Sequence, residues 1–107
     1  MSTTIPAVRL REQAAFTILA QREAAYAYAE SLRSNRIDWL SANSLICAAR
    51  AQAVLTCTAL SDALFDLPAE RAEIERMRDD FDALIDTTLD DLRKTCLLNG
   101  PATRRAA

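Results

Sequence analysis

The amino-acid sequence predicts an all-α protein of three long helices in an antiparallel, up-down-up bundle, completed by homodimerisation. The 107 residues include 21 alanines, three prolines and one glycine, a composition that favours helices over sheets with tight turns. Apolar residues recur at steps of three and four along most of the chain, and two polar breaks separate three such stretches. This length supports one domain, over residues 1–107.

The first helix is expected over about residues 7–33, since Pro6 is tolerated near a first turn. Its inner stripe comprises Val8, Ala15, Ile18, Leu19, Tyr26, Ala29 and Leu32. Tyr26 and Tyr28 lie roughly 200° apart on a helix of about 3.6 residues per turn. One tyrosine should therefore face inward, and the other should face solvent or a second chain.

The second helix is expected over about residues 38–64. Ser34-Asn35-Arg36 predicts the break before it, because Ser and Asn side chains bond to the local backbone, and Asp38 can cap the new helix. Arg50 is its only charged residue between Leu40 and Ser61. A helix this apolar needs cover on both sides, so it is predicted to be central.

Self-association is predicted from this apolar excess and from the alanine-rich second half of the first helix. The residues expected at a two-fold dimer interface are Tyr28, Leu45, Ala49, Ala53 and Leu60. A monomer with a generous core, or a helix of another protein in the same groove, would also satisfy the pattern.

The third helix is expected over about residues 68–98, with Pro68 in its first turn. Its inner stripe comprises Ile74, Met77, Phe81, Leu84, Ile85, Thr88, Leu92 and Cys96. Asn99-Gly100-Pro101 is typical of a helix end. Residues 1–5 and 101–107 are expected to be flexible.

An acidic stripe is expected along this helix, formed by Glu75, Asp79, Asp82, Asp86 and Asp90 at steps of four, three, four and four. Ten carboxylates and only three arginines lie between Asp66 and Asp91. The stripe is interpreted either as a solvated face, partly neutralised by nearby arginines, or as a binding site for a basic protein partner.

Several chemistries are excluded by composition. Without histidine, neither Ser-His-Asp nor Cys-His catalysis is possible, and the cysteine spacing matches no zinc site. One glycine cannot build a phosphate-binding loop, so no catalytic residue, cofactor or metal is predicted. The formal charge of −2 argues against direct nucleic-acid binding.

The sequence also indicates a cytoplasmic protein. No charged-then-apolar leader opens the chain, and Leu40 to Ser61 carries Arg50, Gln52 and Asn43, so a buried helix explains it better than a membrane span. Cys47 and Cys57 lie about 15 Å apart along one helix and cannot form a disulfide with each other. Together with Cys96 they are interpreted as reduced, buried thiols.

The leading functional hypothesis is a non-catalytic protein–protein interaction module, adaptor, chaperone-like or regulatory, of a bacterium or phage. The second is an acidic inhibitor or nucleic-acid mimic that uses the acidic stripe. The third is a small electrostatic enzyme, because Ala20-Gln21-Arg22-Glu23 resembles the first helix of helical chorismate mutases. This chain lacks their lysine in the first loop region and an Asp-x-x-Arg-Glu opening to the second helix, so no site residues are transferred. Arg22 and Arg50 are the residues best placed for such a site.

Overall fold

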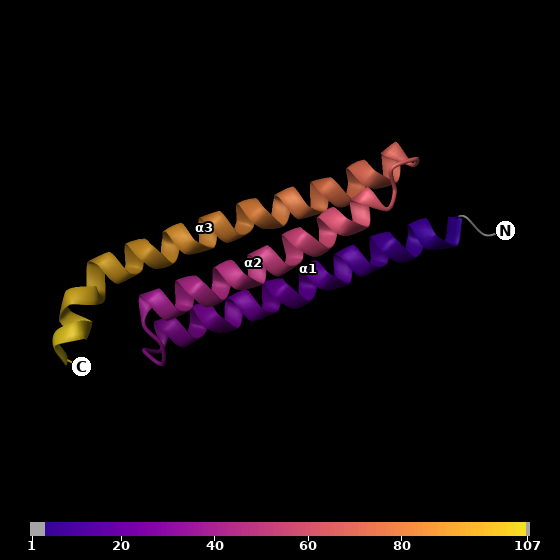
Figure 1. Cartoon of the computed structure of the whole chain (residues 1–107). Coiled ribbons are helices and arrows are strands. Elements are labelled where there is room, and N and C mark those ends of the chain that lie inside the picture. The colour runs from indigo at the N-terminus through magenta and orange to yellow at the C-terminus, as the bar shows by residue number, and fades with distance from the viewer. Residues whose placement is uncertain (1–3, 107) are drawn as a thin grey trace.

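Three helices that pack against one another make up the computed structural model, which describes the backbone of residues 4–106 and the side chains of residues 7–96. They are α1 (Thr4–Arg33), α2 (Trp39–Asp62) and α3 (Pro68–Ala106). The α1–α2 and α2–α3 turns lie at opposite ends of the molecule, and α1 and α3 flank α2 (Figure 1). The radius of gyration is 17.3 Å, above the ~13 Å of a compact chain of this length, so the molecule is a rod.

The α1–α2 turn lies at the predicted break. Asn35 has a φ of 60°, in the left-handed region that asparagine tolerates better than most residues. The backbone N–H of Arg36 donates to the carbonyl of Ser31 at 2.8 Å, which satisfies one of the free carbonyls at the end of α1. Asp38 then caps α2, as predicted, by accepting a hydrogen bond from the backbone N–H of Ser41 at 2.8 Å.

The Asp38 cap should make stability depend on pH in acid. The hydrogen bond from the Ser41 backbone N–H lowers the pKa of Asp38 below its ordinary value of 3.8. The cap therefore stabilises the fold above the unfolded-state pKa, and this contribution is lost as pH falls through the lower folded pKa. We expect Asp38→Ala to lower the melting temperature at pH 7. Asp38→Asn should keep most of it and flatten the acid dependence, as thermal melts between pH 2 and 7 would show.

The core consists of two clusters along the rod. The first includes Ala25, Ala29, Leu32, Ala42, Ile46, Ala53, Phe81, Ile85 and Leu92. The second, nearer the α2–α3 turn, includes Ala7, Ala14, Cys57, Leu60, Leu64 and Ile74. Ile18 packs against both clusters and joins them. Because the buried face of α1 is largely alanine, α1 can lie close to α2.

The end of α3 differs from the prediction. The helix does not stop at Leu98 but continues through Gly100 and Pro101 to Ala106, and α1 begins at Thr4 rather than Ala7. A proline within a helix removes one backbone hydrogen bond and commonly bends the helix instead of ending it. The last turns of α3 bend away from its long axis (Figure 1). Of the expected flexible ends, residues 1–3 and 107 lie outside the described residues.

Candidate interaction surfaces

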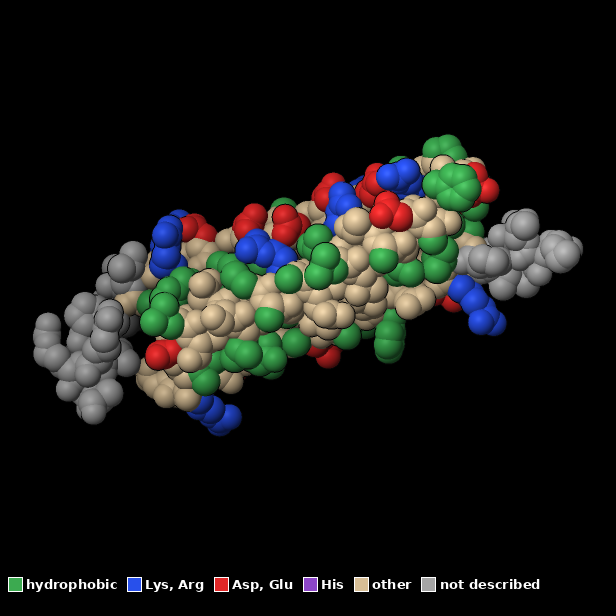
Figure 2. All heavy atoms as spheres, in the orientation of Figure 1, with side chains coloured by type: hydrophobic (Ala, Val, Ile, Leu, Met, Phe, Trp, Pro, Cys, Tyr) green, Lys and Arg blue, Asp and Glu red, His purple; other side chains and the backbone are tan. Residues whose placement is uncertain are grey.

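The predicted acidic stripe is paired with basic side chains of its own chain. Figure 2 shows red and blue side chains interleaved along α3. Each of the five carboxylates in the acidic stripe has an ion-pair partner. The pairs are Arg71 with Glu75 (3.1 Å), Arg78 with Asp79 (3.0 Å), Arg50 with Asp82 (3.7 Å) and with Asp86, and Lys94 with Asp90 (3.0 Å). The charge on this face is therefore mixed rather than uniformly negative.

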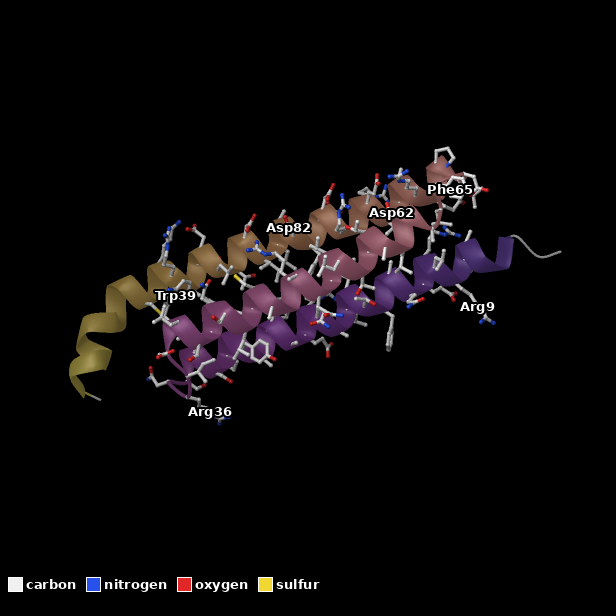
Figure 3. The ribbon with its side chains drawn as sticks, viewed as in Figure 1. Arg9, Arg36, Trp39, Asp62, Phe65 and Asp82 are labelled. Atoms are coloured by element: carbon white, nitrogen blue, oxygen red, sulfur yellow. The ribbon has the colours of Figure 1, made fainter. Side chains whose placement is uncertain are left out.

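Arg50 connects α2 to this stripe. Its guanidinium donates to Asp86 and lies 3.7 Å from a carboxylate oxygen of Asp82, both on α3. Burial lowers the pKa of Arg50, but the hydrogen bond and charge of Asp86 outweigh that effect and leave the pKa raised. The only basic residue of α2 thus belongs to the α2–α3 contact. Asp82, its partner on α3, is labelled in Figure 3.

Four of the five residues expected at a dimer interface lie in the core of their own chain. Ala49, Ala53 and Leu60 are buried, and Tyr28 packs against the first cluster. Only Leu45 is exposed. They lie inside because small residues of α1 pack against this side of α2.

One tyrosine of α1 faces inward and the other outward, as expected, but the inward one is Tyr28 and not Tyr26. Tyr28 faces inward, whereas Tyr26, assigned to the inner stripe, is 47% exposed. The reason is the rotation of α1 about its axis. Because Ala14, Ala25 and Ala29 are the buried positions of α1, Tyr28 lies against the core and Tyr26 lies outside it.

The side of α2 opposite the core is uncharged and uncovered. We call it the α2 outer face, formed by the exposed residues Leu45, Ala48, Ala51, Gln52, Leu55 and Ala59. Leu55 is 69% exposed, and the alanines around it allow close approach of another helix. In Figure 2 the middle of the molecule, over α2, is almost free of charged side chains. An apolar helical strip of this kind is typical of a contact with another protein.

The composition of α2 also meets the requirements for crossing a membrane. Residues Trp39–Asp62 form a helix of 24 residues that is long and apolar enough to cross a membrane, and 33% of its most apolar stretch is buried. Core helices of soluble proteins have the same length and composition.

A second apolar surface is a shallow groove between α1 and α3. It encloses about 260 Å³ and is lined by Ala15, Ile18, Leu19, Arg22, Met77, Asp80, Phe81 and Leu84. Beside it Phe16 is 74% exposed. The sequence pattern does not predict this groove, and its one signal is Phe16, a large apolar residue outside the inner stripe of α1.

The structure does not bring together the residues suggested for an electrostatic enzyme. Arg22 lines the α1–α3 groove, whereas Arg50 is held by Asp82 and Asp86 at the α2–α3 contact. Within the described part of the chain, no three His, Cys, Asp or Glu side chains are grouped so as to hold a metal ion.

The cysteines are free thiols in different environments. Cys57 is fully buried, and burial raises the pKa of its thiol, although Arg78 opposes this shift. Cys47 and Cys96 are half-buried. Cys57 is therefore a small core residue rather than a reactive group.

No protein-family model, curated protein or solved structure matches this chain. The surfaces described above are thus the basis for a functional proposal.

Proposed function

We propose that this protein is a non-catalytic protein–protein interaction module, an up-down-up bundle that pairs as a homodimer in the cytoplasm and binds another protein through the α2 outer face. The observation that carries the proposal is the exposure of Leu55 and Leu45 on a helix face without charge. The hydrophobic effect contributes about 25 cal/mol for each Å² of apolar surface that a partner removes from water.

The ion pairs that the acidic stripe forms within its own chain favour the α2 outer face over α3 as the binding surface. A basic partner or a nucleic-acid-binding protein would have to displace basic side chains such as Arg71, Arg78 and Lys94 from the carboxylates that they already neutralise. Each such exchange of one exposed ion pair for another yields little free energy. The α2 outer face has no such competition within its own chain.

Capture by variants of the immobilised protein tests this proposal. The double variant Ala48→Glu/Leu55→Glu places two charges on the α2 outer face, where a docked apolar surface would have to bury them. We expect it to lose the host proteins that the wild-type chain captures, because burying an unpaired charge is strongly unfavourable. Quantitative mass spectrometry of the eluates measures the loss.

Two control variants locate the effect. Ala20→Glu/Ala27→Glu adds the same charge to exposed positions of α1, and Asp79→Asn/Asp82→Asn/Asp86→Asn removes charge from the acidic stripe. Both should keep the captured proteins, and circular dichroism should show all variants folded. If only the Asn variant lost the captured proteins, the binding surface would lie on α3 and the proposal would be refuted.

A further inference from the structure

The exposed side of α1 carries a regular row of residues that its own chain leaves uncovered. This α1 seam consists of Val8, Glu12, Ala15, Leu19, Arg22 and Tyr26, all exposed and spaced alternately by four and three residues. That spacing is the seam of a helical pair, and the row is about 27 Å long at ~1.5 Å per residue. Ala15, Leu19 and Arg22 also line the α1–α3 groove.

The order of residues in the seam is self-complementary. If a second α1 lies antiparallel with its two-fold axis beside Thr17, residue numbers on the two helices add to 34 wherever they face each other. Val8 then faces Tyr26, and Glu12 faces Arg22. Ala15 faces Leu19, so each large side chain meets a small one at the groove.

The charges of the seam are unsatisfied within the chain. Neither Glu12 nor Arg22 forms an ion pair with another described side chain, whereas every carboxylate of the acidic stripe does. In the antiparallel pair, both charges of each chain would be matched by the opposite charges of the other. A parallel pair in register would instead place Glu12 against Glu12 and Arg22 against Arg22, which is repulsive.

We infer that a second copy of this chain packs antiparallel along the α1 seam, over the α1–α3 groove, with Glu12 of each chain paired to Arg22 of the other. The inference rests on the homodimer of the proposed function and replaces the interface expected from the sequence. Such an interface is closed and two-fold, the commonest form of homo-oligomer. Phe16, which is 74% exposed, lies one residue from the axis beside the seam and gains cover that the single chain does not provide.

This arrangement leaves the α2 outer face free for a different protein. That face has two leucines but no charged residue to set the register or direction of a second copy. The seam has both apolar and charged positions, and charged positions are what fix partner orientation in paired helices. The two surfaces therefore have separate occupants.

Complementary charge reversals test the pairing. In Glu12→Arg the introduced arginine of each chain faces the other chain's Arg22, and in Arg22→Glu the introduced glutamate faces the other chain's Glu12. We expect each variant alone to give the 11.8-kDa chain mass by light scattering at concentrations where the wild type gives twice that mass. Mixed in equal amounts, the two variants should regain the doubled mass as a one-to-one heterodimer, and the double variant should dimerise by itself.

Controls separate charge effects at the seam from general ones. Arg36→Glu and Asp66→Arg make the same reversals in the two turns, where Arg36 points away from the helices (Figure 3), and both should remain dimeric. Recovery in the mixture also excludes misfolding as the cause of dissociation.

Two outcomes would overturn the inference in distinguishable ways. Single variants that remain dimeric, or a mixture that stays dissociated, would reject the antiparallel α1 pairing while the homodimer stands. A wild-type chain that is monomeric throughout the micromolar range would reject the homodimer as well. Neither result affects capture through the α2 outer face, which is measured independently.

Discussion

Ile46→Ala is expected to lower the free energy of unfolding by about 2–5 kcal/mol, the typical effect of truncating a fully buried isoleucine. Ile46 is 0% exposed and belongs to the first core cluster, to which all three helices contribute. A thin rod has few such residues, so the neighbours cannot collapse fully into the cavity. For a chain of about 100 residues this corresponds to a fall in melting temperature of roughly 10 °C or more.

Leu55→Ala is the matched control for Ile46→Ala. Leu55 lies on the same helix but is 69% exposed, so its truncation should change stability only slightly. Urea unfolding followed by circular dichroism, at one protein concentration because dimerisation adds to apparent stability, gives both values. Equal effects at the two positions would mean that a different side of α2 faces the core.

Ala53→Leu is expected to destabilise the chain by about 1–3 kcal/mol, because it adds three carbon atoms to a closely packed contact. Ala53 is 1% exposed and shares its cluster with Ala25, Ala29 and Ala42, so α1 and α2 meet there through small side chains. A leucine would push the two helices apart along the length of the rod. Urea unfolding should show the change in midpoint.

Ala48→Leu provides the control for Ala53→Leu, since Ala48 is exposed on the α2 outer face. Leucine and alanine have similar helix propensities, so this change should be close to neutral for stability. If Ala53 were instead at the dimer interface, Ala53→Leu would change the proportion of dimer in solution. It would leave the stability of the dilute monomer unchanged.

Local features of the sequence were sufficient for most of the element order. Asp38 caps α2, and the α1–α2 break falls at Ser34-Asn35-Arg36, because capping and left-handed turns depend on residues near in sequence. The inner stripe of α3 was predictable for the same kind of reason: Ile74, Phe81, Ile85 and Leu92 recur at helical spacing and are buried. The end of α3 was not, since Pro101 bends a helix or ends it according to context.

The sequence by itself determined three helices, their breaks and the buried face of α3. Only the tertiary structure decided which sides of α1 and α2 are buried, and with them the places of Tyr26, Tyr28 and Ala53. The physical reason is that α1 and α2 carry small or apolar residues around much of their circumference. Their rotation is therefore set by how closely they pack and by contacts distant in sequence, such as Arg50 with Asp86, and not by their own periodicity.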